Sequence, residues 1–248
     1  MATSVDKAFR ILSYLADHSE KAIGEISENL SIHRSSVYRL VKVLERYGSV
    51  ERGGSRGSYR LGKMMLQIGS VALSDFGLCQ IGRPFIEELR DKTKETTYLT
   101  TFSDGEVLYM DYKASTYGIA AMARPGMRLP AHCTSSGKLF LSFDLSFRER
   151  VFQKPLKRYS KYTITDLETM RKELGVIQRK EYAICKDEYE SGITSIAAPI
   201  FANGSAIVAA IAIAGPTSRM KKIAPIIRIL KKAASEISEI LGEKGRPS

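Results

Sequence analysis

Residues 32–49 read IHRSSVYRLVKVLERYGS, and this stretch has two distinct faces when it is coiled into a helix. Four apolar residues follow the helical spacing i, i+3, i+4 and i+7 and form one stripe: Val37, Leu40, Val41 and Leu44. Hydroxyl and cationic side chains, without a carboxylate, occupy the opposite side: Ser35, Arg39, Lys42 and Arg46. A charged face opposite an apolar stripe is usually a solvated surface, so the flanking segments must decide whether this one does more.

The flanking segments predict a winged helix-turn-helix. Two short helices are expected before the quoted stretch, over residues 5–16 and 23–30. Two short strands at 50–52 and 58–61 follow it, joined by the glycine-rich connector GGSRG. In this order the third helix lies in the major groove of DNA, because a groove about 12 Å wide admits one helix with its side chains. Residues 1–62 are therefore predicted to bind DNA.

The third helix and the tip of the wing carry the candidate DNA contacts. Hydroxyl and cationic side chains there suit phosphates and base edges. The candidates are Arg34, Ser35, Ser36, Tyr38, Arg39, Lys42 and Arg56. Between residues 34 and 63, eight cations stand against two acids, so this region is a local basic patch.

The composition of the whole chain agrees with an anionic partner. The chain has 248 residues, 44% of them hydrophobic, and a net charge of +11. A surplus of this kind favours nucleic acid, an anionic surface or an acidic ligand. No apolar run reaches the ~18 residues of a membrane span, and no basic-then-apolar signal opens the chain, so we expect no membrane partner. Three scattered cysteines fit a reducing compartment, and a cytoplasmic location is expected.

From residue 79 onward the pattern predicts an α+β domain, an antiparallel sheet covered by helices. One hairpin is expected around Ser103-Asp104-Gly105 and another around Asn203-Gly204. Helices are expected at 81–94, 134–143, 146–152, 166–180 and 224–241. The mostly apolar stretch 63–78 reads as a linker helix, covered either by a partner subunit or by the core of the first domain.

Five segments, in this order, resemble the IclR family of bacterial and archaeal transcriptional regulators. They are residues 26–44, YRLG at 59–62, LPAHCTSSGK at 129–138, residues 181–201 and AIAIAGPTSR at 210–219. The resemblance implies a winged helix-turn-helix at 1–62, a linker helix at 63–78 and a GAF/PAS-like effector-binding domain at 79–248. It also implies a homodimer or tetramer on a pseudo-palindromic operator in double-stranded DNA. Repression in response to a small organic effector is the expected function.

The resemblance places an effector pocket on definite residues of this chain. They are Ala121, Leu129, Ser135, Ser136, Cys185, Ile193, Ser195, Ala212 and Ala214. The chain departs from the family at Cys185, where many members have Asp, at Ser195, where Cys is common, and at 212–215, where Ser-x-Ser-Gly is frequent. These changes predict a less polar pocket, and hence an effector with one anionic end and an apolar body, such as an aromatic acid, or a pocket without a ligand.

Other functions fit the sequence less well. No glycine-flanked elbow surrounds Ser135, so an enzyme is not expected. No fourth ligand joins His132, Cys133 and Cys185, and no phosphate-binding glycine motif is present, so neither a metal nor a cofactor is expected. The stronger alternative is an architectural nucleic-acid-binding protein whose C-terminal domain only oligomerises. The basic run at 219–232 favours it, unless this run is a solvated helix face.

Overall fold

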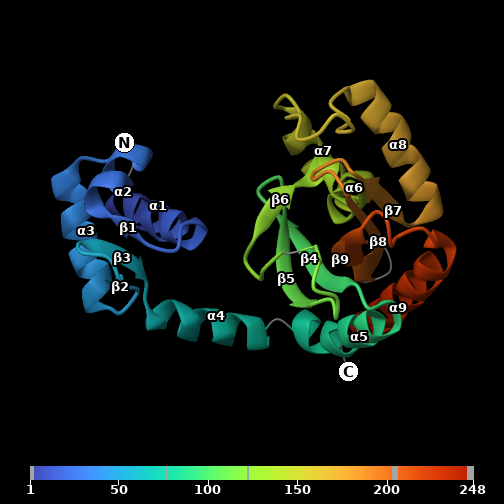
Figure 1. The fold of residues 1–248 in the computed structure, drawn as a ribbon, viewed down its shortest axis with the longest axis horizontal. Helices are drawn as coiled ribbons and strands as arrows, with labels where there is room; N and C mark the ends of the chain where they lie inside the picture. The colour runs from blue at the N-terminus through green and yellow to red at the C-terminus, as the bar shows by residue number, and fades with distance from the viewer. Residues whose placement is uncertain (1–2, 76, 122, 203–205, 245–248) are drawn as a thin grey trace. The chain divides into compact units, whose positions relative to one another are not determined.

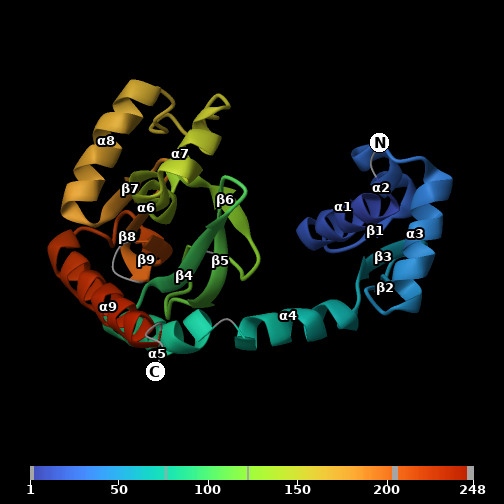
Figure 2. The same ribbon diagram turned by 180° about the vertical axis from the view of Figure 1, so that it is seen from behind.

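The structure, a computed structural model, describes residues 3–75, 77–121, 123–202 and 206–244. The chain divides into two compact units, Met1–Phe76 and Gly77–Ser248, each with its own hydrophobic core (Figures 1 and 2). The first is a helix-turn-helix unit and the second an antiparallel sheet with helices, so the predicted α+β fold is confirmed. No helix among the described residues is long and apolar enough to cross a membrane.

The N-terminal unit follows the predicted winged helix-turn-helix order. Its elements are α1 (Ser4–Asp17), β1 (Lys21–Ala22), α2 (Ile23–Leu30), α3 (Arg34–Arg46), β2 (Val50–Arg52), β3 (Ser58–Leu61) and α4 (Lys63–Asp75). The hairpin strands β2 and β3 pair antiparallel, and the two-residue β1 adds to the other edge of β3. Strand β1 was not predicted, because two residues carry no detectable alternation.

The apolar stripe of α3 faces the core of this unit. Val37 and Val41 are fully buried, and Leu40 and Leu44 pack against the same cluster. The remaining buried members are Ile11, Leu15, Ile26, Ile32, Val50 and Tyr59. Burial of the stripe turns the hydroxyl and cationic face of α3 to solvent, as its two-sided sequence predicted.

A close contact joins the end of α3 to the start of α4. Gly48 ends the helix with a φ of +69°, a left-handed conformation that favours glycine. Gly62 N–H donates to the Ser49 carbonyl at 2.9 Å, and Met64 N–H donates to the Gly48 carbonyl at 3.0 Å. A Cβ atom on Gly62 would lie 2.2 Å from that Gly48 oxygen, so only glycine allows this approach.

The C-terminal unit is a six-stranded antiparallel sheet in the order β6-β5-β4-β9-β8-β7. Its elements are α5 (Gly77–Thr93), β4 (Thr96–Ser103), β5 (Glu106–Lys113), β6 (Arg128–Pro130), the 3-10 helix η1 (Ala131–Cys133), α6 (Ser135–Phe143), α7 (Leu145–Phe152), α8 (Leu167–Lys180), β7 (Ala183–Lys186), β8 (Ile193–Ala202), β9 (Ala206–Pro216) and α9 (Ile223–Lys244). Helix α5 begins four residues before the predicted start at 81, so Gly77 and Leu78 belong to α5 and not to the helix of the predicted linker.

Both predicted hairpins of the C-terminal unit are present as antiparallel strand pairs. Asp104 and Gly105 join β4 to β5 with positive φ values of 53° and 85°, the geometry that a two-residue hairpin turn needs. Strands β8 and β9 pair along their length as predicted. The turn expected at Asn203-Gly204 lies outside the described residues.

Helices cover both faces of the sheet (Figures 1 and 2). One core contains side chains of α6, α7 and α8, and the other contains side chains of α5 and α9. Strand β9 alternates between them, with Ala210, Ala212 and Ala214 in the first core and Ile211 and Ile213 in the second. The small side chains of β9 therefore lie on the face that also carries the cavity described below.

Candidate functional site

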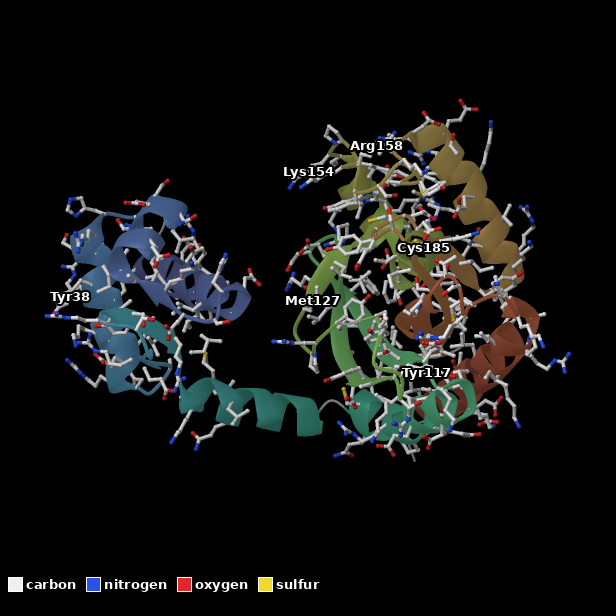
Figure 3. All side chains as sticks on the ribbon, viewed as in Figure 1. Tyr38, Tyr117, Met127, Lys154, Arg158 and Cys185 are labelled. Carbon is white, nitrogen blue, oxygen red and sulfur yellow. The ribbon has the colours of Figure 1, made fainter. Side chains whose placement is uncertain are left out.

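A groove of about 600 Å³ runs between α3 and the wing of the N-terminal unit. It is lined by Ala22, Ile23, Gly24, Arg34, Ser35, Tyr38, Arg52, Arg56, Gly57 and Tyr59. The groove brings together four of the predicted DNA contacts: Arg34, Ser35, Tyr38 and Arg56. Tyr38 is 53% exposed and projects from α3 (Figure 3). The other three candidates, Ser36, Arg39 and Lys42, also lie on α3 but outside the lining of this groove.

The cations of this surface differ in whether they are already paired. Within the part of the chain that the structure describes, Arg34, Arg39 and Arg56 make no ion pair or hydrogen bond through their side chains. Lys42 Nζ donates to Glu45 Oε2 at 2.7 Å, and Arg52 lies 3.3 Å from the same carboxylate. The sequence predicted that this cationic face of α3 has no carboxylate. That prediction is wrong at Lys42, because the carboxylate of Glu45, one helical turn further on, forms an ion pair with it.

The tip of the wing is held by a carboxylate from before β1. Glu20 accepts hydrogen bonds from Gly54 N–H at 2.7 Å, from Ser55 N–H at 3.2 Å and from the Ser55 hydroxyl at 2.6 Å. The Ser55 hydroxyl and the Gly54 amide lower the pKa of Glu20, because they stabilise the ionised carboxylate. Arg56 follows directly in the chain, so Glu20 fixes the backbone that presents it.

The C-terminal unit contains a cavity of about 220 Å³. It is lined by Tyr98, Tyr109, Ala121, Ala123, Met127, Leu129, Cys133, Thr134, Cys185, Glu188, Tyr189, Glu190, Ile193, Ser195 and Ala214. Six predicted effector residues are in this lining: Ala121, Leu129, Cys185, Ile193, Ser195 and Ala214. The other three, Ser135, Ser136 and Ala212, are buried and do not line it. Ser135 and Ser136 instead form the first turn of α6.

Aromatic and apolar side chains make up much of the cavity lining. The rings of Tyr98 and Tyr109 meet edge to face with centroids 5.1 Å apart. The Tyr98 hydroxyl donates to the Ala121 carbonyl at 2.8 Å, and burial raises the pKa of Tyr98 to about 12. Neither tyrosine was predicted, because β4 and β5 show only ordinary strand alternation in the sequence. The position of Tyr98 follows from the pairing of β4 with β9, which places Tyr98 opposite Ala212 and which the sequence alone does not reveal.

Thiol and hydroxyl groups in the cavity lining are engaged within the protein. Thr134 caps α6 by accepting from Gly137 N–H at 3.3 Å, and its hydroxyl donates to the Pro130 carbonyl at 3.1 Å. The Cys185 thiol donates to the Cys133 carbonyl at 2.9 Å. Burial raises the pKa of Cys133 to about 12 and raises that of Cys185 as well, so both remain protonated thiols at neutral pH.

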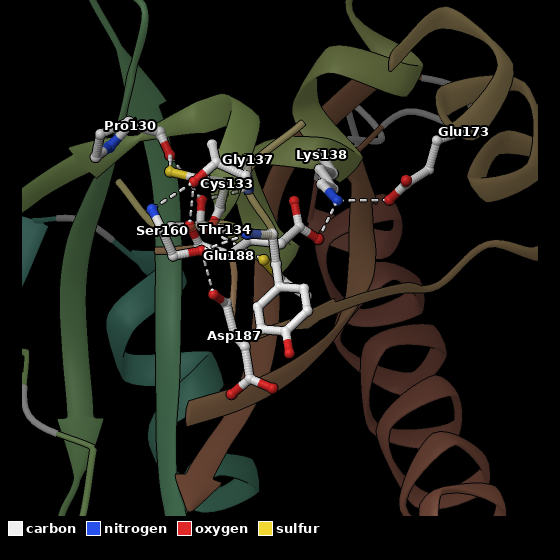
Figure 4. A network of polar contacts seen from close by, with 12 residues as sticks. Pro130, Cys133, Thr134, Gly137, Lys138, Ser160, Glu173, Asp187 and Glu188 are labelled. Carbon is white, nitrogen blue, oxygen red and sulfur yellow. Dashed lines mark hydrogen bonds and ion pairs between the residues drawn. The ribbon is translucent and has the colours of Figure 1, made fainter. Parts of the chain in front are cut away.

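A buried ion network adjoins the cavity at Glu188 (Figure 4). Lys138 is fully buried, and its Nζ contacts Oε1 of Glu173 and Oε1 of Glu188, each at 2.5 Å. Burial raises the pKa of Glu188, and the charge of Lys138 opposes that effect. The cavity therefore has a carboxylate in its lining, and the predicted loss of a pocket carboxylate at Cys185 is offset at Glu188.

His132 has a structural role beside this network. Its Nε2 donates to the Lys157 carbonyl at 2.8 Å, and burial lowers its pKa, so the ring is neutral at pH 7. Across residues 3–75, 77–121, 123–202 and 206–244, no group of three histidine, cysteine, aspartate or glutamate side chains is arranged to hold a metal ion.

Two protein-family models match the chain over most of its length. The IclR helix-turn-helix domain matches residues 4–54, and the bacterial transcriptional regulator IclR C-terminal domain matches residues 70–239. The chain belongs to the IclR family. Its members are DNA-binding transcriptional regulators with a C-terminal ligand-binding domain and not enzymes, as the sequence predicted.

Individual members of the IclR family resemble the chain over its full length. The HTH-type transcriptional regulator KdgR of Escherichia coli is 28% identical over 253 residues, which cover 99% of this chain and 95% of that protein. The HTH-type transcriptional repressor AllR of Escherichia coli is 26% identical over 252 residues, which cover 99% and 93%. The crystal structure of an IclR homolog from Microbacterium hydrocarbonoxydans complexed with 4-hydroxybenzoate is 29% identical, with a TM-score of 0.83 and coverage of 96% and 99%.

Proposed function

We propose that this IclR-family protein is a sequence-specific repressor whose binding to operator DNA is changed by a small organic effector. The carrying observation is the cavity of about 220 Å³ in the C-terminal unit, whose lining combines aromatic, apolar and polar side chains. A family relative that is named as a repressor supports the direction of regulation. The two units then have separate tasks, one reading DNA and the other sensing the ligand.

The DNA side of the proposal rests on the groove between α3 and the wing. Unpaired Arg34 and Arg56 lie along this groove with Ser35 and Tyr38. Unpaired cations gain most from phosphate or guanine, because they have no internal partner to give up. Arg39 is also unpaired on the same helix, so we assign these five residues the main contacts, and Ser36 and Lys42 secondary ones.

The effector side of the proposal favours a small aromatic acid. The cavity is smaller than the roughly 300–1,000 Å³ of cavities that hold drug-sized ligands. Tyr98 and Tyr109 offer ring faces and edges to an aromatic body. A homologous structure, complexed with 4-hydroxybenzoate, supports this size and class.

The assembly that we propose is a homodimer, alone or paired into a tetramer. Helix α4 exposes three large apolar side chains, Met64 at 38%, Leu66 at 75% and Ile68 at 50%. Apolar side chains in such numbers on one short helix favour cover by a second copy. Two copies present two α3 helices to the two halves of a pseudo-palindromic operator.

The testing experiment is a DNA-binding titration by fluorescence anisotropy. A duplex from the region upstream of the gene is compared with a shuffled duplex at low and near-physiological salt, with and without 4-hydroxybenzoate. Selective binding that persists at the higher salt and changes with the ligand supports the proposal, because non-specific phosphate binding falls steeply with salt. Equal binding to both duplexes that vanishes with salt contradicts it.

An architectural DNA-binding protein is the second candidate, favoured by the basic run at 219–232. Several cations of this run are paired internally. Arg219 contacts Glu95 through two nitrogens, Lys231 lies 3.3 Å from Glu181, and Lys232 lies 3.7 Å from Glu236. Internal pairing reduces their attraction for DNA, so the observation that favours this candidate is weaker in the folded protein. Salt-sensitive binding to both duplexes in the titration above would support it.

A further inference from the structure

The loop between β5 and β6 forms part of the cavity lining. Its described residues are 114–121 and 123–127, and three of them line the cavity: Ala121, Ala123 and Met127. Tyr117 and Met127 of this loop are labelled in Figure 3. A segment between two strands opens locally at lower cost than the strands themselves, so the contacts of this loop decide how closed the cavity stays.

Main-chain hydrogen bonds hold both ends of the β5–β6 loop. Near its start, Thr116 N–H donates to the Lys94 carbonyl at 3.1 Å. Near its end, Gly126 N–H donates to the Tyr109 carbonyl at 2.8 Å. The middle of the loop lies between these anchors and depends on other contacts.

Side chains from outside the loop hold its middle. The hydroxyls of Thr96 and Tyr98 both donate to the Ala121 carbonyl, at 3.0 and 2.8 Å. Arg219 Nη2 donates to the Ile119 carbonyl at 2.8 Å. The Ile119 side chain is 76% exposed, so burial of apolar surface contributes little to holding this part of the loop.

Arg219 is itself fixed on two sides. Its Nε and Nη2 donate to Oε1 and Oε2 of Glu95 at 2.5 and 2.8 Å, and Glu95 is only 4% exposed. Two parallel hydrogen bonds of this kind set both the position and the orientation of a guanidinium group. The centroid of the Tyr117 ring lies 4.3 Å from Arg219 Cζ, within the range of a cation–π contact. Arg219 therefore joins a buried carboxylate to two residues of the loop, Tyr117 and Ile119.

We propose that Arg219 is a positioning residue of the cavity. Bound to Glu95, it holds the β5–β6 loop closed, and its release from Tyr117 and Ile119 opens the route to the cavity. The part of this inference that concerns the effector rests on the proposed function, because it takes the cavity to be the effector site. The effector then enters and leaves through this local opening, and a bound effector favours the closed loop.

Two cysteines in the cavity lining provide a test that needs no ligand. Cys133 and Cys185, the cavity cysteines, are buried in this lining, whereas Cys79 is buried in the core on the other face of the sheet. The full-length protein is treated with methyl methanethiosulfonate, and the labelling rate of each cysteine is followed by peptide mass spectrometry. Opening of the loop exposes the cavity cysteines alone, whereas unfolding of the unit exposes all three.

Arg219→Ala is expected to raise the labelling rates of the cavity cysteines about tenfold or more and to leave that of Cys79 unchanged. The reason is that the variant lacks the charged donor that holds the Ile119 carbonyl. Tyr117→Ala keeps this hydrogen bond and removes only the ring contact, so it should raise the same two rates by a smaller factor.

Arg83→Ala is the matched control. Arg83 also pairs with a buried carboxylate, that of Asp111, at 2.8 Å, but this pair joins α5 to β5 and neither residue lines the cavity. The control is expected to leave the labelling of the cavity cysteines unchanged. In the parent protein, 4-hydroxybenzoate is expected to slow the labelling of these cysteines, because binding favours the closed loop.

The outcomes separate this inference from the proposed function. Equal labelling rates in Arg219→Ala and the parent would overturn the role of Arg219, and protection by 4-hydroxybenzoate would in that case still support the effector site. Faster labelling of Cys79 together with the cavity cysteines, or an equal effect of Arg83→Ala, would assign Arg219 to general stability and also overturn the inference. Faster labelling of the cavity cysteines alone, without protection by the ligand, would support the role of Arg219 and contradict the proposed ligand class.

Discussion

Lys138 is a fully buried cation between two carboxylates, and its contribution to stability follows from that arrangement. Removing a charge from water is costly, and the loss is recovered only while its partners remain. Glu173 is partly exposed and can regain water, whereas Glu188 cannot. The consequence of losing Lys138 therefore falls mainly on Glu188.

Lys138→Met is expected to lower the free energy of unfolding of the C-terminal unit by about 3–5 kcal/mol at pH 7, because it leaves a buried carboxylate unpaired. Burial raises the folded-state pKa of Glu188, so the charged form is the unfavourable one. Lys138 lowers the pKa of Glu188, so in the variant that pKa should be higher still; the loss should be largest above it and should shrink as the pH falls through it. Urea unfolding followed by circular dichroism over a series of pH values measures this, and a loss that stays the same across the whole series would contradict the assignment.

Helix α3 carries one cation, Arg39, that has no ion pair among the described residues, and one, Lys42, that is paired with Glu45. Arg39→Ala is expected to cost about 1–3 kcal/mol of operator binding and to relax sequence preference if Arg39 reads a base. Lys42→Ala should cost less, because Lys42 already shares its charge with Glu45. Anisotropy titrations on the operator and on a shuffled duplex measure both changes. A larger loss for Lys42→Ala would reverse the assignment.

At the scale of elements, local pattern predicted most of the N-terminal unit. The helix at 23–30 and the strands at 50–52 and 58–61 have the bounds that their apolar spacing and glycine connector indicated. Strand β1 was missed because it exists only through its pairing with β3, some 37 residues away in the chain. The contact between Glu20 and the wing was missed for the same reason, since it joins residues far apart in sequence.

The wing depends on that contact, and Glu20→Ala tests it. Loss of the carboxylate removes three hydrogen bonds to Gly54 and Ser55, so the loop that presents Arg56 gains freedom. Ordering the loop on DNA would then cost conformational entropy. Operator affinity is expected to fall a few-fold, with faster amide exchange confined to the wing. Unchanged exchange at Gly54 and Ser55 would show that Glu20 does not hold the loop.

The cavity was predictable only in part from the sequence. Leu129, Cys185 and Ser195 could be placed through segments that resemble the IclR family. Tyr98 and Tyr109 could not, because their place depends on which strands pair and in which register. Glu188 escaped notice because an acidic residue in a loop is ordinarily solvated, and nothing local shows its burial against Lys138.

The proposed effector response would involve the whole molecule, because it couples a site in one unit to DNA binding by the other. Ala214→Leu is expected to fill part of the cavity and to bring the ratio of operator affinities with and without 4-hydroxybenzoate to about one. A ligand shifts an equilibrium only through its differential affinity for two states, so a blocked cavity removes the shift. Paired anisotropy titrations measure the ratio. A response equal to that of the parent protein would place the effector elsewhere.

The proposed homodimer is also tested at the scale of the whole molecule, through α4. Leu66→Glu places a charge on an apolar side chain that is 75% exposed, so it should disrupt an interface without disturbing a core. The mass in light scattering is expected to fall, and operator affinity to weaken on the order of a hundredfold as two linked half-site contacts become one. A dimer that persists unchanged would show that α4 is not the dimer contact.

The glycine contact between the turn after α3 and the start of α4 has a mechanical consequence. These segments are joined by two backbone hydrogen bonds and approach too closely for a Cβ atom on Gly62. The start of α4 is therefore held firmly against the end of α3. A rotation of α4 about its own axis should therefore turn the reading helix through a similar angle. Under the proposed function, Gly62 is therefore the position at which such a rotation would be passed on to the DNA-binding helix.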